Sequence, residues 1–236
     1  MTPAALTEVM EQTWPPAQAF AVGPWRIRDG QGGGKRVSAA TAGPDWSDEA
    51  IPQAEAAMAS LHQTPLFMIG QGDDLLDQAL QSRGYRVVDP VVAYVVPSAA
   101  LANPPAAPMA AFAHWPPLAI CVEIWRDAAI GPARLAVMER TSGPKCVVLG
   151  RSNDQPTGVA FVAIHRHIAM LHALEVRPEA RRQGSAHNIL RAAAAWAQEN
   201  GADTLSLVVT VANTAARNLY ASLGMQGVGH YHYRQK

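Results

Sequence analysis

The chain has 236 residues, of which 19 are basic and 19 acidic, and 49% are apolar. This length allows one large domain or two small ones. The balanced charge argues against nucleic acid as the main partner, because nucleic-acid binders carry a surplus of Lys and Arg. The two cysteines provide no disulfide framework, and no run reaches the roughly 18 apolar residues of a membrane span. With no signal-peptide pattern at the N-terminus, we expect a cytoplasmic protein without a membrane partner.

The first predicted elements are a short amphipathic helix over residues 4–13 and two strand-like segments over 19–27 and 35–41. A glycine run, Gly30–Gly34, lies between these segments. Such a run between two strands predicts a hairpin turn. A phosphate cradle is the alternative, because two basic residues follow the run, although no helix start follows them.

From residue 47 to residue 96 the pattern predicts two helices that alternate with two strands. Ser47-Asp48-Glu49 caps the first helix, and Gly84 ends the second. The expected elements are helices over 47–61 and 73–83 and strands over 65–69 and 85–96.

A stretch rich in proline and alanine over 98–117 is expected to be an extended linker. It separates a first unit, 1–97, from a second unit, 118–236. In the second unit the patterns predict a helical region broken by a Gly-Pro pair, then a hairpin, two further strands and a last helix. The expected ranges are 120–138, 145–150 with 157–165, 167–176, 204–209, and a helix that Asn213 opens.

The strongest chemical signal lies where a strand gives way to a helix over 185–200. The turn between them contains Arg181, Arg182 and Gly184, and no carboxylate follows until Glu199. A helix start presents unpaired N–H groups and a partial positive charge, so arginines in place of acids favour a bound phosphate or pyrophosphate. A solvated basic helix start is the alternative. The spacing fits neither a Walker loop nor a dinucleotide fingerprint.

Two motifs in the second unit resemble those of the GNAT acyltransferase superfamily. Residues 176–186, with the pattern Val-x-Pro-x-x-Arg-x-x-Gly-x-Ala, are similar to the family's coenzyme A pyrophosphate loop. Residues 213–225 begin with Asn, contain Leu-Tyr and end with Gly-Met, and they resemble the family's second signature. The motifs stand in the family's order, separated by one helix and one strand. The resemblance extends over about residues 145–234.

The resemblance implies an α/β (α+β) GNAT fold over 118–236, with a mixed central sheet flanked by helices. In the first unit, 1–97, a helix that ends at Gly84 parallels the one that ends at Gly224. We therefore interpret this unit as a degenerate GNAT-like α+β half without a coenzyme loop of its own. An unrelated α+β extension is the alternative.

The resemblance also implies acetyl-CoA as the cosubstrate. Its pantetheine arm would lie between two splayed strands and pair with Leu174 and Val176. The loop N–H groups would hold the pyrophosphate, and Asn213 would bond the pantetheine or the chain near it. The implied coenzyme-binding residues are Leu174, Glu175, Val176, Arg181, Arg182, Gln183, Gly184, Ser185, Ala186, His187, Asn213 and Tyr220. The histidines show no metal-ligand pattern, so no metal is expected.

Tyr220 follows Asn213 by two helical turns, which places both side chains on one helix face. The resemblance implies that its phenol protonates the leaving thiolate. A core aromatic in a stripe with Leu219 and Leu223 is the alternative.

Acyl transfer to an amine also calls for a general base. Many relatives carry a Glu where this chain has Val208. The candidates are then Glu175 and His172, with His165 and His167 near the start of the same strand. Strand alternation places His172 on the side of Leu174 and Glu175 on the other, so His172 is the better-placed base, with an ordinary pKa near 6.5. A histidine on the strand surface is the alternative. Cys146 is interpreted as a core residue.

The resemblance leaves two candidate functions. The first is an N-acetyltransferase that moves an acetyl group from acetyl-CoA to a primary amine by direct attack in a ternary complex. The second is an acyl-CoA-binding sensor or pseudoenzyme without turnover. The acceptor stays open among small amines, amino acids, peptide N-termini and lysines, and a homodimer is compatible with the sequence.

Overall fold

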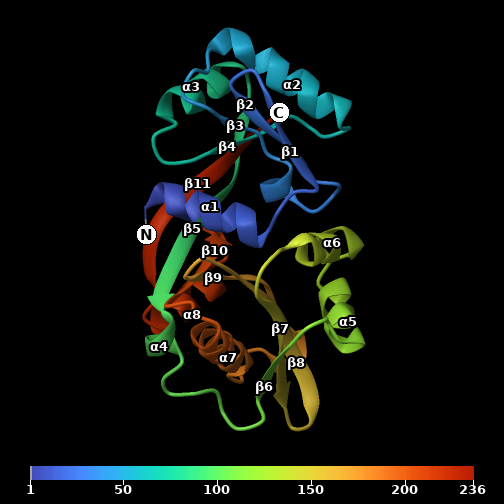
Figure 1. The fold of residues 1–236 in the computed structure, drawn as a ribbon, viewed down its shortest axis with the longest axis vertical. Coiled ribbons are helices and arrows are strands. Elements are labelled where there is room, and N and C mark those ends of the chain that lie inside the picture. The colour runs from blue at the N-terminus through green and yellow to red at the C-terminus, as the bar shows by residue number, and fades with distance from the viewer. Residues whose placement is uncertain (1) are drawn as a thin grey trace.

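The computed structural model describes residues 2–236 of the chain. An eight-stranded mixed sheet runs through the molecule, and a three-stranded sheet covers one end of it (Figure 1). Helices flank the large sheet, as the resemblance implied. No helix in the described residues is long and apolar enough to cross a bilayer.

The second half of the chain supplies most of the large sheet. Its helix α7 (Ser185–Glu199) packs on one face of β7 to β10, and α5 with α6 packs on the other. In chain order its elements are β6 (Ala111–His114), α5 (Ala119–Asp127), α6 (Pro132–Arg140), β7 (Lys145–Ser152), β8 (Gln155–His165), β9 (Ile168–Val176), the 3₁₀ turn η3 (Pro178–Ala180), α7, β10 (Thr204–Thr210), α8 (Thr214–Ser222) and β11 (Gln226–Gln235).

The first half begins with α1 (Pro3–Thr13), which lies across the middle of the molecule (Figure 1). Its remaining elements are β1 (Gln18–Val22), β2 (Trp25–Asp29), the 3₁₀ turn η1 (Lys35–Val37), β3 (Thr41–Ala42), the 3₁₀ turn η2 (Asp48–Ala50), α2 (Ile51–Ser60), β4 (Leu66–Ile69), α3 (Asp74–Ser82), β5 (Arg86–Pro97) and α4 (Ser98–Leu101).

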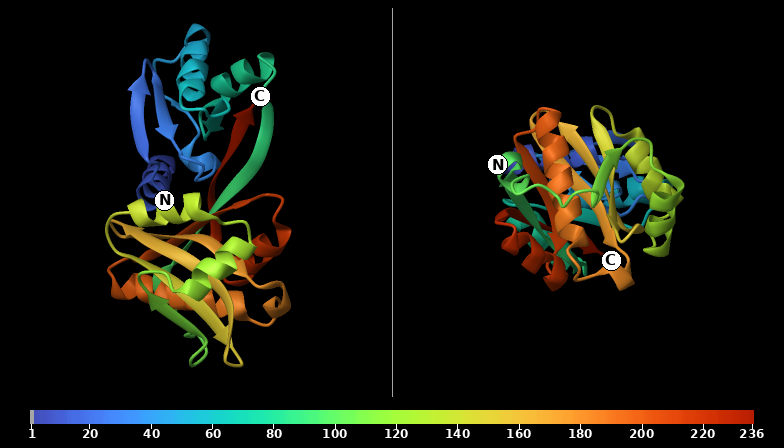
Figure 2. Two further views of the ribbon diagram at one scale, coloured as in Figure 1. Left: turned by 90° about the vertical axis from the view of Figure 1, so that its right-hand side faces the viewer. Right: turned by 90° about the horizontal axis from the view of Figure 1, so that it is seen from below.

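The two halves exchange their last strands. The strand order of the large sheet is β4-β11-β5-β10-β9-β8-β7-β6. Strand β5 thus lies between β10 and β11, and β11 lies between β4 and β5, with all three contacts antiparallel. Figure 2 shows β5 (green) and β11 (red) running side by side from one half into the other. The last strand of each half therefore lies within the sheet of the other half.

The neighbours β9 and β10 pair over only part of their length. Their parallel register runs from Ile168↔Thr204 to Leu171↔Leu207, and beyond it the strands separate. At the separation, Ala173 has a φ of +50° and β9 shifts its register against β8. Trp125 donates its indole N–H to the Ala173 carbonyl at 2.8 Å, which fixes this bulge. The strands of the second half are splayed as the resemblance implied.

Apolar side chains join the halves as well as filling each one. A cluster containing Leu6, Val9 and Met10 of α1 packs against strands β4, β5, β9 and β11. A second cluster places Trp14 against Phe161 on β8. Since buried apolar area is the main favourable term in folding, the halves are stabilised as one body.

Three local expectations differ from the structure. Residues 19–27 are not one strand, because Gly23, with a φ of +56°, turns the chain into the hairpin β1–β2. The glycine run Gly30–Gly34 does lie between two antiparallel strands, β2 and β3, but the expected strand 35–41 begins as η1 and pairs only from Thr41. The stretch 98–117, expected as an extended linker, contains α4 and also β6, the edge strand that pairs with β7.

Candidate active site

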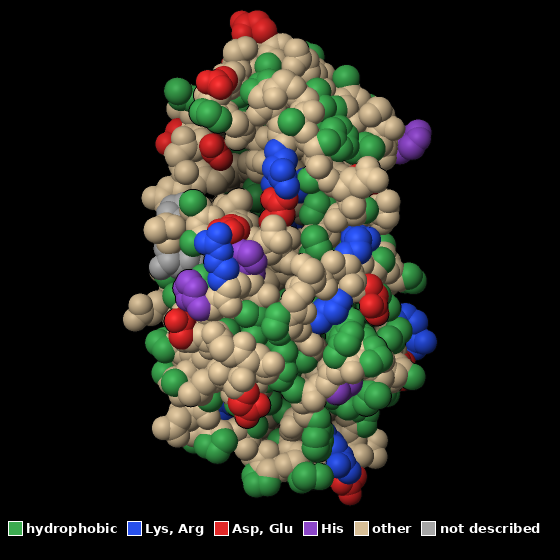
Figure 3. Space-filling view, in the orientation of Figure 1, with side chains coloured by type: hydrophobic (Ala, Val, Ile, Leu, Met, Phe, Trp, Pro, Cys, Tyr) green, Lys and Arg blue, Asp and Glu red, His purple; other side chains and the backbone are tan. Residues whose placement is uncertain are grey.

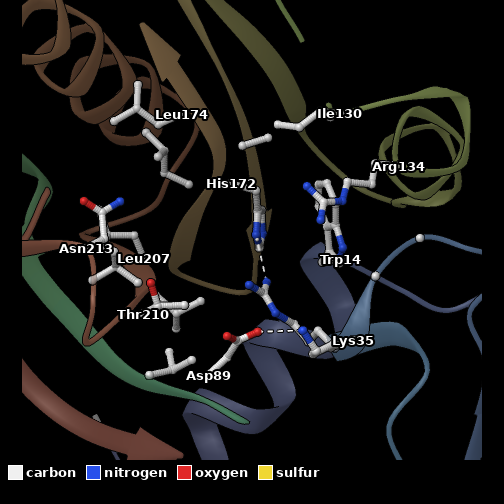
Figure 4. Close-up of a pocket in the computed structure, with 18 of the residues that line it drawn as sticks. Trp14, Lys35, Asp89, Ile130, Arg134, His172, Leu174, Leu207, Thr210 and Asn213 are labelled. Atoms are coloured by element: carbon white, nitrogen blue, oxygen red, sulfur yellow. Dashed lines mark hydrogen bonds and ion pairs between the residues drawn. The ribbon is translucent and has the colours of Figure 1, made fainter. Parts of the chain in front are cut away.

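A cavity of about 420 Å³ opens where β9 and β10 separate. Its lining comes from both faces of the sheet and from both halves of the chain. Figure 4 shows Asn213, Leu207 and Thr210 on one side of His172, and Trp14 with Arg134 on the other. The first half and β11 contribute Trp14, Gly33, Gly34, Lys35, Arg36, Asp89, Val91, Tyr231 and Tyr233 to the wall.

The turn before α7 leaves its backbone donors free. Within the described residues, no N–H group from Arg182 to His187 donates a hydrogen bond. Gly184 has a φ of +85°, with no heavy atom within 4 Å of where a Cβ would stand. No acidic residue lies in the first helical turn. This turn therefore has the donors, charge and room that a diphosphate requires.

The loop residues surround a second hollow rather than the main cavity. This hollow, of about 320 Å³, is lined by Gln183, Ser185 and Asn188 together with residues 107–110. Asn188 accepts a hydrogen bond from the backbone N–H of Ala107 at 3.1 Å. The chain between α4 and β6 thus forms the outer wall of the turn before α7.

Tyr220 reaches the cavity from α8. Its side chain is 5% exposed and packs on the Tyr94 ring at 5.8 Å, and its hydroxyl has no hydrogen-bond partner within the described residues. Burial, with a smaller effect of the Glu175 carboxylate, raises the pKa of Tyr220 to about 12. The phenol is therefore protonated at neutral pH and free to donate.

Asn213 lies at the N-terminus of α8. Its side-chain oxygen accepts from the Ala216 backbone N–H at 3.1 Å, which caps the helix. The side-chain amide borders the cavity (Figure 4). Tyr220 follows on the same helix. The cap explains why a short helix begins here and points Tyr220 at the separated strands.

Glu175 borders the cavity together with Leu174, because the bulge at Ala173 interrupts strand alternation. Burial raises the pKa of the Glu175 carboxyl, against the opposing effects of Arg181 and Arg134. Within the described residues this carboxylate accepts no hydrogen bond. Val176 lies outside the cavity and pairs with Gly158 on β8.

His172 is held between two partners. The Arg36 guanidinium donates to its Nδ1 at 3.0 Å, and the Thr13 hydroxyl lies 2.9 Å from its Nε2. Guanidinium can only donate, so Nδ1 is the acceptor and Nε2 carries the proton. Thr13 in turn donates to the Val9 carbonyl at 2.6 Å. Burial, and then the charge of Arg36, holds the pKa of His172 well below its usual range.

The two other candidate histidines lie away from the cavity lining. His165 contacts the Glu8 carboxylate on α1 at 3.0 Å, and His167 lies in the turn between β8 and β9. Within residues 2–236, no three His, Cys, Asp or Glu side chains gather as a metal site requires.

Sequence reasoning missed the cavity residues of the first half. Trp14, Lys35, Arg36 and Asp89 lie far along the chain from the recognised motifs. The one available signal was the basic pair that follows the glycine run. Across the face in Figure 3, acidic and basic side chains are interspersed, which agrees with the zero formal net charge.

Comparison with known proteins identifies the fold. A GNAT-family N-acetyltransferase from Kribbella flavida is 19% identical, with a TM-score of 0.75 over 99% of this chain and 95% of that one. A functionally unknown conserved protein from Staphylococcus epidermidis is 12% identical, with a TM-score of 0.72 over 98% of both chains. A tandem GNAT protein from the clavulanic acid biosynthesis pathway is 12% identical, with a TM-score of 0.63 over 98% of this chain and 87% of that one.

Sequence comparison agrees with the fold. An uncharacterized N-acetyltransferase, YobR, from Bacillus subtilis is 30% identical over 95 residues, which are 39% of this chain and 38% of that relative. The alignment thus covers well under half of each protein. The model of the acetyltransferase (GNAT) family matches residues 105–225, which include β6 to α8 and all the coenzyme motifs. The chain belongs to the acetyltransferase (GNAT) family.

Proposed function

We propose that this protein is an N-acetyltransferase that moves the acetyl group of acetyl-CoA to a primary amine. The observation that carries the proposal is the free phenol of Tyr220, buried beside the gap between β9 and β10. The ring is buried, whereas the hydroxyl faces the cavity and has no hydrogen-bond partner within the described residues, so a ligand can reach it. A thioester sulfur at this point would give the hydroxyl a partner.

The anion-binding turn supports the same function. Its free N–H groups from Arg182 to His187 and the two arginines fit the diphosphate of the coenzyme. The separated edges of β9 and β10 offer backbone groups to an extended pantetheine arm, as a strand would take them.

The proposed chemistry is direct attack of a neutral amine on the thioester carbonyl. The nitrogen–carbon bond forms, Glu175 takes the proton that the now cationic nitrogen releases, and the carbon–sulfur bond breaks. Tyr220 gives its proton to the departing thiolate. Because burial raises the pKa of Glu175, its carboxylate is suited to accept a proton near neutral pH. Tyr220, with a pKa of about 12, is protonated there and can donate its proton.

Glu175 is preferred over His172 as the base on hydrogen bonding. The Nδ1 lone pair of His172 already accepts from Arg36, and Nε2 already carries a proton. A proton arriving at Nδ1 would break the bond to Arg36 and place two cations in contact. We assign His172 the role of holding Arg36.

The experiment pairs binding with turnover. Acetyl-CoA and free CoA are titrated calorimetrically into wild type and Tyr220→Phe, and thiol release is followed with a panel of amines. We expect equal coenzyme affinity in both proteins and a fall in turnover of roughly 100-fold or more in the variant. Equal turnover would reject Tyr220 as the acid, and binding without turnover for any amine would favour a sensor.

A further inference from the structure

The cavity holds more positive than negative charge. Lys35 and Asp89 form an ion pair at 2.7 Å and neutralise each other (Figure 4). Of the remaining charged lining residues, Arg36 and Arg134 are cationic and Glu175 is anionic. Within the described residues, neither arginine lies within ion-pair distance of a carboxylate. One guanidinium charge therefore stays uncompensated even when Glu175 is ionised.

Arg36 is held in place with donors to spare. One of its five N–H groups donates to His172, which is fixed through Thr13. Its Nε is buried and has no hydrogen-bond partner within the described residues. Arg36 lines the cavity, and its Nη2 is accessible and has no hydrogen-bond partner within the described residues, so a ligand can reach the Nη donors rather than the enclosed Nε. A carboxylate matches the planar fork of a guanidinium with two parallel hydrogen bonds.

The reacting groups lie at a different place in the cavity. Tyr220 reaches the cavity from α8, where its ring packs on Tyr94. Arg36 reaches the cavity from η1 and donates to His172, which Thr13 and Trp14 contact from the side of α1. An acceptor that spans the cavity therefore meets the acid and base at one end and Arg36 at the other.

Building on the proposed function, we propose that the acceptor amine also carries a carboxylate, as an amino acid does. Arg36 binds this carboxylate, and the amine faces Glu175 and Tyr220. Trp14 and Tyr231 also line the cavity. An amine without an anionic group leaves the Arg36 donors unpaired, so the cavity discriminates against it.

The first test compares matched acceptors in the wild-type protein. The twenty common L-amino acids are screened by thiol release, and the best is compared with its primary amide, its decarboxylated amine and O-phosphoethanolamine. We expect kcat/KM for the amide and the amine to be about 10- to 100-fold lower than for the acid. The proposal would be overturned by equal rates for the acid and the amide, by reaction only of amines that carry no anionic group, or by a preference for O-phosphoethanolamine.

The second test removes the guanidinium. In Arg36→Gln we expect the preference for the acid over the amide to shrink to within about threefold, with unchanged coenzyme affinity. Arg36→Lys, which keeps the charge and loses the fork, should retain part of the preference. The matched control is Arg126→Gln, an exposed arginine on α5 paired with Asp127. A preference that survives in Arg36→Gln would reject Arg36 as the carboxylate ligand.

A third measurement separates this inference from the proposed function. The best amino acid, its N-acetyl derivative and the amides of both are titrated calorimetrically into the protein with and without CoA. Failure of CoA to bind would reject the proposed function, while tighter binding of the acids than of the amides would still support the carboxylate site. Equal binding of acids and amides in a protein that binds CoA would reject the carboxylate site alone.

Discussion

The two halves of the molecule have the same order of elements but differ at the point where a coenzyme would bind. The series β1-β2-β3-α2-β4-α3-β5 is repeated by β7-β8-β9-α7-β10-α8-β11. In the second half, the turn before α7 carries Arg181 and Arg182. In the first half, the turn before α2 carries Asp45, Asp48 and Glu49. A diphosphate would be repelled there, so a repeated topology does not repeat the site.

The space between the two parallel strands also differs between the halves, being open in the second half and filled in the first. In the second half, β9 and β10 pair over four residues and then separate to open a cavity. In the first half, the parallel contact is a single bridge, Ala40↔Phe67. Phe67 packs between Trp25 and Tyr85, with ring centroids 5.3 and 5.4 Å apart. Aromatic side chains thus fill the place that corresponds to the cavity of the second half.

The largest effect is expected from the carboxylate on β9. Glu175→Gln removes the proposed base and should lower kcat roughly 100-fold or more, with unchanged coenzyme affinity. In wild type, kcat/KM should rise with pH as Glu175 loses its proton, at a pH above the ordinary range of Glu because burial raises its pKa. The measurement is a pH–rate profile of both proteins.

The same profile tests the acid and the competing base. Because the pKa of Tyr220 is about 12, the phenol stays protonated and no descending limb should appear below about pH 10. His172→Gln should change which acceptor is preferred, and it should have less effect on the rise of kcat/KM with pH. If the rise of kcat/KM with pH were lost in His172→Gln and kept in Glu175→Gln, His172 would be the base instead of Glu175.

The next effect concerns the turn that distinguishes the halves. Gly184→Asp places a negative charge where the diphosphate is proposed to bind and should weaken CoA by about 10- to 100-fold in calorimetry. Gly201→Asp is the matched control, because Gly201 has a φ of +84°, is equally open, and lies at the other end of α7. If Gly201→Asp or Gly184→Asn lost as much affinity as Gly184→Asp, backbone strain rather than charge would explain the effect.

A smaller effect is expected where one half holds the last strand of the other. Asp77 on α3 accepts from Arg234 at 2.7 and 2.9 Å and from His232 at 2.7 Å, both on β11. Arg234 is 5% exposed, so Asp77→Asn leaves a buried cation uncompensated and should cost about 2 kcal/mol of unfolding free energy. Urea unfolding measures it.

The pH dependence of this contribution has a defined sign. Hydrogen bonds from Arg234 lower the pKa of Asp77 in the folded state. Its stabilisation is therefore present above the unfolded pKa of about 4 and is lost as the pH falls through the lower folded value. The difference in stability between wild type and Asp77→Asn should shrink on acidification; a constant difference would contradict the ion pair.

The smallest effect is expected in the acidic turn. Asp45→Asn with Asp48→Asn should leave CoA affinity unchanged to within about twofold, because these residues line neither the cavity nor the hollow beside the turn before α7. Tighter binding in the double variant, seen by calorimetry, would show that the coenzyme senses the first half.

Local patterns predicted the second half well because each signal is local. Asn213 caps a helix, Gly184 takes a left-handed turn, and apolar periods mark α7 and β10. The strand exchange could not be foreseen, because β5 has the same alternation whichever neighbour it pairs with. Alternation also failed at Ala173, a non-glycine residue with a positive φ, and this bulge brings Glu175 to the cavity beside His172.

The part of the cavity around Arg36 could not be predicted from the sequence, for a related reason. Arg36 reaches the cavity through tertiary packing alone, from a 3₁₀ turn that no pattern predicted. Its partner His172 has the alternating position of a surface histidine, yet α1 covers it through Thr13 and Trp14. Such contacts depend on how the halves pack and not on the period of either segment.

The exchange of strands has a consequence for the order of folding during synthesis. Strand β5 is complete at Pro97, whereas its neighbours begin only at Thr204 and Gln226. Both edges of β5 stay unpaired until the ribosome has made those segments, and unpaired edges invite association with other chains. The first half therefore cannot close its share of the sheet as it emerges, and β5 is open to pairing with other chains until β10 and β11 have been made.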